Sequence, residues 1–181
     1  TVVVQCDQGL GDQIMFAQAL PDMAMDCKKV ILETSERLAP LFRRNFPDID
    51  VHDTLKHKGI DWPKQYKIDA AMHLSWIGKY YRNDPKQFKK VPYLKPDPEK
   101  VADVRKALEN LPRPWVGIAW RGGIPETNTK ARSMELNDLA PVIKAGGSII
   151  SLAYQDVRQE IARWNIDNAE QITVPVIDNT G

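Results

Sequence analysis

A glycine-bearing loop near the start of the chain carries the first side chains that could do chemistry. The run Gln8-Gly9-Leu10-Gly11-Asp12-Gln13 lies between a short β-branched segment and an amphipathic one, where a strand gives way to a helix. It lacks the third glycine of a dinucleotide fingerprint and the Lys-Ser/Thr of a phosphate-binding loop. Asp12 would compete with a phosphate for the helix N-terminal amides, so the loop favours an uncharged, hydroxyl-rich partner. The alternative is that Asp12 only caps the helix and the glycines only form the turn.

A second loop, in the other half of the chain, is basic. Trp120-Arg121-Gly122-Gly123 ends a predicted strand, and Lys130-Ala131-Arg132-Ser133 follows shortly after it. The glycines allow a ligand to approach the backbone closely, and the three cations can neutralise a diphosphate. Such a loop could hold a nucleotide sugar and stabilise the charge of its departing group. The alternative is a solvated connection between a strand and a helix.

A third candidate is the segment His73-Leu74-Ser75-Trp76, which ends another predicted strand. No acid or second histidine is spaced to form a triad or a metal site with His73, so a hydrogen-bonded polar residue is the simpler interpretation. Trp76, Tyr80 and Tyr81 could stack on a sugar, although packing in a core or an interface is the commoner use of such side chains.

The elements that must position these loops alternate between strand and helix. Apolar runs predict strands. Apolar stripes that follow Asp12, Ser35, Asp97 and Asp156, and another that begins at Leu136, predict helices, and the first of these is expected to kink or break at Pro21. The strands are expected at 1–5, 29–33, 49–51, 68–74, 115–120, 148–153 and 172–176. This alternation is typical of an α/β protein with parallel sheets and right-handed crossovers.

A cluster of prolines, Pro92, Pro96 and Pro98, marks the best linker. We therefore expect a Rossmann-like domain at 1–91, a linker and connecting helix at 92–112, and a second Rossmann-like domain at 113–181. The second has about three strands where a complete sheet of this kind has five or six. Because both ends of the sequence also lie in or beside apolar runs, we expect the chain to be a piece of a longer protein.

Composition and charge exclude several classes. With 43% hydrophobic and 27% charged residues the chain is globular, and 25 Lys+Arg against 24 Asp+Glu argue against a nucleic-acid partner. No apolar run approaches the roughly 20 residues of a transmembrane helix. Cys6 and Cys27 have neither zinc-like nor redox spacing, so we expect reduced thiols in a cytoplasmic protein.

A series of segments, in order over almost the whole chain, resembles the glycosyltransferase domain that follows tetratricopeptide repeats in many bacterial proteins. That family is related to the heptosyltransferase-like glycosyltransferase family 9 and, more distantly, to O-linked N-acetylglucosaminyltransferases. The matching segments are Gln8-Gly9-Leu10-Gly11-Asp12-Gln13-Ile14, Phe16-Ala17, Leu20-Pro21, Val30-Ile31-Leu32-Glu33, Pro92-Tyr93-Leu94-Lys95-Pro96-Asp97-Pro98, Val116-Gly117-Ile118-Ala119-Trp120, Arg132-Ser133, Leu139-Ala140-Pro141 and Ser151-Leu152.

The resemblance implies a GT-B architecture, with two Rossmann-like domains that bind the acceptor on the N-terminal side and a nucleotide-diphosphate sugar on the C-terminal side. Asp12 matches the general base of an inverting, metal-independent transfer. The acceptor side would include Gly9, Gly11, Gln13, His73 and Trp76, and the donor side Arg121, Gly122, Gly123, Lys130, Arg132, Ser133 and Tyr154. No cofactor is expected beyond the nucleotide sugar itself.

This chain departs from the family at two strand ends. It has Trp-Arg-Gly where relatives often have Trp-Ser-Gly or Trp-Ala-Gly, and Ser151-Leu152-Ala153-Tyr154-Gln155 where they tend to have Ser-Leu-Gln. The family's later strands and histidine-bearing helix would follow Gly181, so we expect the segment alone to be inactive. The prediction is a glycosyltransferase acting on a glycan or protein hydroxyl. The alternatives are a non-catalytic GT-B-derived binding or scaffold module, and another GT-B enzyme such as a nucleotide-sugar epimerase.

Overall fold

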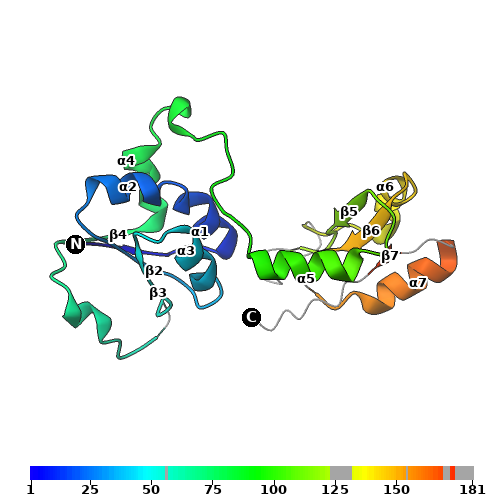
Figure 1. The fold of residues 1–181 in the computed structure, drawn as a ribbon, viewed down its shortest axis with the longest axis horizontal. Coiled ribbons are helices and arrows are strands. Elements are labelled where there is room, and N and C mark those ends of the chain that lie inside the picture. Colours follow the sequence, from blue (N-terminus) through cyan, green and yellow to red (C-terminus); the bar gives the residue numbers. More distant parts are fainter. Residues whose placement is uncertain (56, 123–131, 154, 169–171, 174–181) are drawn as a thin grey trace. The chain divides into compact units, whose positions relative to one another are not determined.

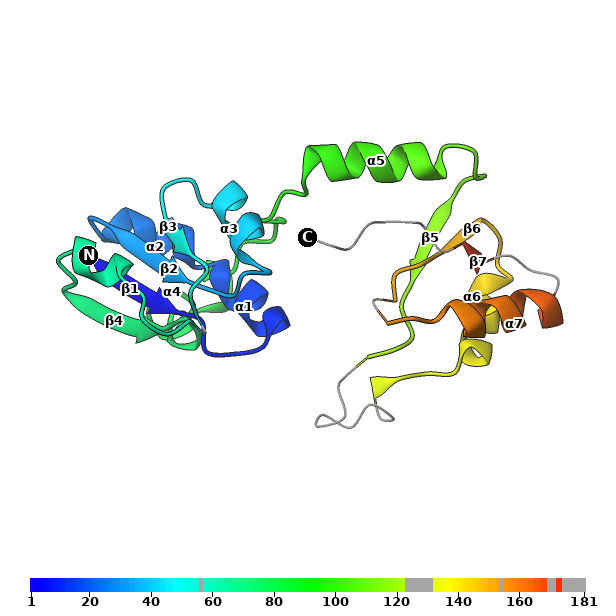
Figure 2. The same ribbon diagram turned by 90° about the horizontal axis from the view of Figure 1, so that it is seen from below.

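The computed structural model describes residues 1–55, 57–122, 132–153, 155–168 and 172–173. The chain divides into two units, Thr1–Asp97 and Pro98–Gly181, each built on a parallel sheet (Figures 1 and 2). The α/β class expected from the sequence is therefore confirmed. Three predicted donor residues, Gly123, Lys130 and Tyr154, lie outside the described residues.

The first unit contains a four-stranded sheet in the order β3-β2-β1-β4. Its strands are β1 (Val2–Gln5), β2 (Val30–Glu33), β3 (Asp50–His52) and β4 (Ala70–His73), and all the neighbouring pairs are parallel. Gln5 is in register with both Glu33 and His73, so the carboxyl ends of the three strands are level. Every residue of β2 is buried, as expected of a parallel strand that is covered on both faces.

The main core of this unit includes Val4 and Leu32 of the sheet and the fully buried Phe42 of α3. Its helices are α1 (Leu10–Ala17), α2 (Leu20–Asp26) and α3 (Ala39–Asn45). The alternate strand residues Val3 and Ile31 pack separately with Trp62 of η1 (Trp62–Gln65). Pro21 lies in the first two positions of α2. Of the kink or break expected at Pro21, the structure has the break, because proline fits a helix start but not its interior.

The aromatic segment after β4 forms short helical turns. These are η2 (Leu74–Trp76), α4 (Gly78–Tyr81) and η3 (Pro85–Gln87). The proline-rich stretch that follows packs on the first unit: the ring of Tyr93 stacks on Phe46 with centroids 6.2 Å apart, and Arg44 Nη1 lies 3.2 Å from a carboxylate oxygen of Asp97. The first unit therefore extends to Asp97.

The second unit begins with α5 (Pro98–Leu108) and contains three parallel strands in the order β5-β6-β7. The strands are β5 (Trp115–Ile118), β6 (Ser148–Ser151) and β7 (Ile172–Thr173), and the helices between them are η6 (Leu136–Leu139), α6 (Ala140–Ile143) and α7 (Arg158–Asn168). Trp120, Ile149 and Trp164 belong to the buried cluster that joins the helices to the sheet.

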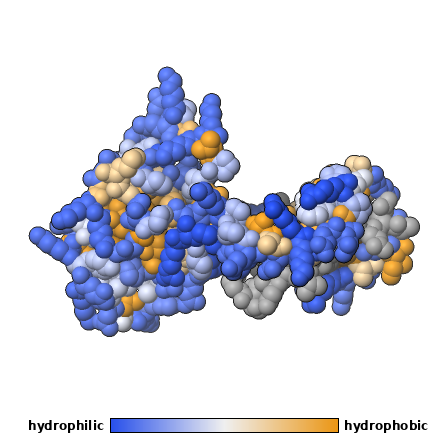
Figure 3. All heavy atoms as spheres, in the orientation of Figure 1, coloured by the Kyte–Doolittle hydropathy of each residue, from blue (hydrophilic) through white to orange (hydrophobic). Residues whose placement is uncertain are grey.

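The surface seen in Figure 3 is mostly hydrophilic, with hydrophobic atoms in small groups. Large side chains that remain exposed include Met25, Trp76, Tyr80 and Ile166. In the part of the chain that the structure describes, no helix has the length and apolar character needed to cross a membrane.

One prediction about the first loop is wrong. Asp12 does not cap the helix, because α1 begins at Leu10 with Gly9 as its N-cap, and Asp12 lies in the first turn. Gly9 has the extended backbone (φ −63°, ψ 166°) that this position requires, and its carbonyl accepts a hydrogen bond of 3.0 Å from the Gln13 N–H. The helix therefore starts before the carboxylate, which is left free for another role.

Candidate functional site

The carboxyl ends of β1 and β4 form the natural site for a ligand in the first unit. From β1 the chain adds β2 and β3 on one side of the sheet and β4 on the other, so the strand order reverses at β1. Ligands of open α/β sheets bind at such a switch point. The loop after β1 enters α1, β4 continues into η2, and α1 and η2 lie close together. The fold thus brings Asp12, His73 and Trp76 to one edge of the sheet.

Asp7 joins the two loops at this edge, and the sequence analysis missed it. Its Oδ2 accepts a hydrogen bond of 2.6 Å from Ser75 Oγ and one of 3.1 Å from Gln8 Nε2, while its Oδ1 accepts one of 3.2 Å from the Ser75 N–H. Partial burial raises the pKa of Asp7, but these hydrogen bonds outweigh it and hold the pKa below its ordinary value. Its place two residues after β1, in the loop that leads to α1, was the signal that could have revealed it.

Asp12 and Asp7 are both exposed, but the carboxylate of Asp12, unlike that of Asp7, is not engaged. No hydrogen bond or ion pair joins it to any other residue that the structure describes. Its Oδ2 lies 3.4 Å from the position that a Cβ on Gly9 would occupy, so a larger residue at that position would contact the carboxylate. Gly11 is also exposed, and a Cβ there would meet nothing within 4 Å. The surroundings of Asp12 are open.

The aromatic side chains of this edge fall into two groups. Trp76 is 59% exposed and its ring lies edge-on to His73, with centroids 5.7 Å apart; Tyr80 is 60% exposed. Tyr81, in contrast, packs against the core, and burial together with a hydrogen bond to Asp26 raises its pKa to about 12. Trp76 and Tyr80 therefore remain available to stack on a ligand, and Tyr81 does not.

Gln13 is buried and connects two elements of the site by hydrogen bonds. It is 3% exposed, its Nε2 donates a hydrogen bond of 2.8 Å to the Gln8 carbonyl, and its Oε1 accepts one of 2.9 Å from Thr34 Oγ1. Both polar atoms of the amide are used. The predicted acceptor-side residue thus lies beneath the loop, where it connects α1 to the end of β2.

In the second unit, Gly122 and Ser133, at the two ends of the basic loop, form hydrogen bonds with each other. Ser133 Oγ donates to the Gly122 carbonyl and accepts from the Gly122 N–H, both at 3.2 Å. A Cβ on Gly122 would lie 2.8 Å from the Arg132 carbonyl oxygen, so glycine is needed here for backbone packing. The side chain of Arg132 is exposed.

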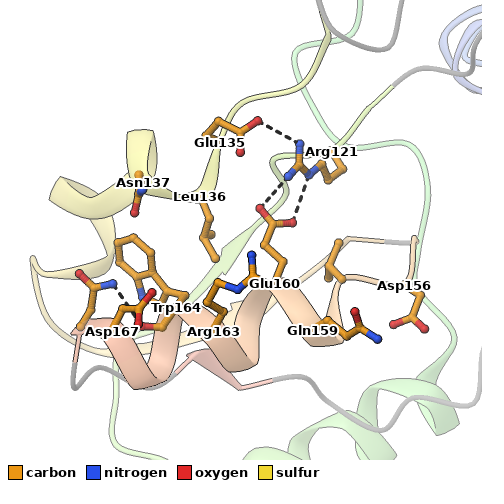
Figure 4. A pocket seen from close by; sticks show the side chains of 12 residues that line it. Arg121, Glu135, Leu136, Asn137, Asp156, Gln159, Glu160, Arg163, Trp164 and Asp167 are labelled. Carbon is orange, nitrogen blue, oxygen red and sulfur yellow. Dashed lines mark hydrogen bonds and ion pairs between the residues drawn. The ribbon is translucent and has the colours of Figure 1, made fainter.

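Arg121 is already paired with carboxylates (Figure 4). Its Nε and Nη2 contact the two oxygens of Glu160 at 3.2 and 2.7 Å, and its Nη1 lies 3.6 Å from Glu135 Oε1. The hydrogen bonds to Glu160 raise the pKa of Arg121, although burial opposes this. The sequence could not reveal this partner, which is 39 residues away along the chain.

These side chains border an open pocket of about 750 Å³ between η6 and α7. The lining contains two arginines and four acidic residues, so its net charge is negative. Its residues are Arg121, Glu135, Leu136, Asn137, Asp156, Val157, Gln159, Glu160, Arg163, Trp164, Asp167 and Asn168. As it stands, this pocket does not offer the excess of positive charge that a diphosphate needs.

Among the described residues, no three His, Cys, Asp or Glu side chains gather as they would around a metal ion. No protein-family model matches the chain, and no solved structure is significantly similar to it. Over 176 residues the chain is 33% identical to Protein FlbA of Caulobacter vibrioides. The match covers 89% of this chain but 29% of FlbA, so the chain spans less than a third of that relative.

Proposed function

We propose that the chain is part of a GT-B glycosyltransferase that moves a sugar from a nucleotide-diphosphate sugar to a hydroxyl of a glycan or protein. The observation that carries the proposal is Asp12, an exposed carboxylate with no described partner at the switch point of a Rossmann-like sheet. The neighbouring carboxylate, Asp7, is occupied by Ser75 and Gln8 and cannot serve in its place.

Asp12 would act as the general base of an inverting displacement. Its carboxylate takes the proton of the acceptor hydroxyl while that oxygen attacks the anomeric carbon, and the bond from this carbon to the diphosphate breaks. The exposed ring of Trp76 supports the proposal, because aromatic faces stack on the apolar face of a sugar. His73, whose ring lies against Trp76, would border the same acceptor.

On the donor side, the proposal depends on Arg132, whose side chain is exposed, and on Lys130, Gly123 and Tyr154, which lie outside the described residues. Gly122 and Ser133 would act indirectly, since they fix the two ends of the loop. The reaction needs nucleotide sugars, which supports a cytoplasmic location. Tetratricopeptide repeats in the whole protein would supply a surface for a protein acceptor.

The test uses the full-length protein, because the chain spans less than a third of FlbA. Release of nucleoside diphosphate is measured with a panel of UDP-, GDP- and dTDP-sugars and a cell extract as the acceptor source. Asp12→Asn should lower turnover at least about 100-fold, the effect of losing a general base, with donor affinity unchanged. Asp48→Asn, which removes an exposed carboxylate elsewhere in the same unit, is the control. Undiminished turnover in the Asp12 variant would rule out this residue as the base.

A second candidate is a non-catalytic module that binds glycans or proteins and keeps the fold. The pairing of Arg121 with Glu160 and Glu135 favours it, because a cation used inside the protein is withdrawn from a diphosphate. Binding of the full-length protein to a glycan array, without turnover of any nucleotide sugar, would favour this module over the transferase.

A further inference from the structure

Two arginines, Arg121 and Arg163, line the pocket that contains the Glu160 carboxylate. Arg121 holds it from the end of β5 through two hydrogen bonds. Arg163, on α7 three residues after Glu160, lines the same pocket (Figure 4). No ion pair or hydrogen bond of Arg163 is found within the described part of the chain, and its side chain is exposed. The pocket thus combines one arginine that is paired with Glu160 and one that has no partner among the described residues.

The geometry of this contact is that of an arginine bound to an anion. Nε and Nη2 of Arg121 form a fork that bonds two oxygens at once, and the same fork fits the oxygens of a phosphate. Glu160 also lies in the first turn of α7, where negative charge is stabilised by the helix dipole. A phosphate group in place of this carboxylate would gain the same interactions.

We propose that the pocket binds a phosphate-bearing ligand between Arg121 and Arg163, and that Glu160 occupies this position until the ligand displaces it. The volume of about 750 Å³ is within the range of small-molecule sites, roughly 300–1,000 Å³. The identity of the ligand as a nucleoside diphosphate rests on the proposed function; the anion site itself rests on the two arginines and the pocket.

Two of the other three acids of the pocket, Asp156 and Glu135, leave room for this exchange. Asp156 is paired with Arg158, whose Nη2 lies 2.9 Å from it. Glu135 is 75% exposed and 3.6 Å from Arg121, so its carboxylate can turn toward water at little cost. Glu160 is only 26% exposed and is held at 2.7 Å. Of the two acids paired with Arg121, Glu160 is therefore the one that limits the access of an anion.

The test measures the affinity of the chain for inorganic pyrophosphate by titration calorimetry. Glu160→Gln keeps the size of the side chain and removes its charge, so pyrophosphate should bind at least about tenfold more tightly than to the wild type. Glu109→Gln removes one exposed negative charge directly after α5, outside the pocket, and should change the affinity less than about twofold. If the Gln variant does not fold, Glu160→Ala tests the same displacement.

Two further variants identify the anion site. In the Glu160→Gln background, Arg121→Gln and Arg163→Gln should each remove the gained affinity. An unchanged affinity in folded Glu160→Gln, or a gain that survives both arginine substitutions, overturns the proposal. If the full-length protein turns over a nucleotide sugar but Glu160→Gln does not raise the affinity for pyrophosphate, the proposed transferase stands and the displacement of Glu160 is ruled out. If the affinity rises but no nucleotide sugar is turned over, the anion site stands and the transferase is ruled out.

Discussion

Among single residues, the structure separates polar side chains that are already satisfied from those that remain available. Three polar side chains form hydrogen bonds within the protein: Asp7, Gln13 and Ser133. Asp12 and Trp76 are exposed at the edge of the first sheet. A polar group whose hydrogen bonds are all made within the protein has little to offer a ligand. Asp12 and Trp76 are therefore the better guide to the chemistry of the site.

A prediction at this scale concerns two glycines of the second unit. Gly147 has φ +94°, and a Cβ on it would lie 2.5 Å from the Pro114 carbonyl oxygen, so Gly147→Ala should lower the free energy of unfolding by at least about 2 kcal/mol. A Cβ on Gly117 would meet the end of the exposed Leu152 side chain, which can turn aside, so Gly117→Ala should cost less than about 1 kcal/mol. Urea unfolding measures both; equal losses would contradict the backbone argument.

At the scale of elements, apolar runs were sufficient to predict the strands. Val2–Gln5 and Val30–Glu33 are short β-branched segments that parallel sheets bury on both faces, and both formed strands as expected. Helix starts were less predictable, because Asp12 and Gly9 are both acceptable caps and only the backbone hydrogen bonds decide between them. The partner of Arg121 was not predictable, since Glu160 is brought to it by the fold.

The attachment of α1 to β2 yields a prediction about an element. Thr34→Val leaves Gln13 Oε1 buried without its donor and should lower the free energy of unfolding by about 1–3 kcal/mol. Adding Gln13→Leu should cost less than the sum of the two single changes, because the second partner no longer needs a hydrogen bond. Chemical unfolding of the four proteins of this cycle measures the difference, and strict additivity would show that the bond does not couple the two elements.

At the scale of the whole molecule, the chain has two units with separate hydrophobic clusters. The cluster around Phe42 uses residues of the first unit, and the cluster around Ile149 uses residues of the second. Because the clusters share no residue, each unit has its own source of cooperativity. A base at Asp12 and a donor loop at Arg132 would then belong to parts of the chain that are stabilised independently.

This organisation predicts that damage to one core spares the other. Phe42→Ala removes a fully buried ring and should cost about 3–5 kcal/mol, whereas Ile149→Ala, at 2% exposure, should cost about 2–5 kcal/mol. In differential scanning calorimetry the wild type should unfold in two transitions, and each substitution should lower the midpoint of a different one. Hydrogen exchange assigns the transitions, since Phe42→Ala should accelerate exchange in β1 and β2 and leave β5 and β6 unchanged. A single transition that both substitutions shift equally would mean that the two units unfold together.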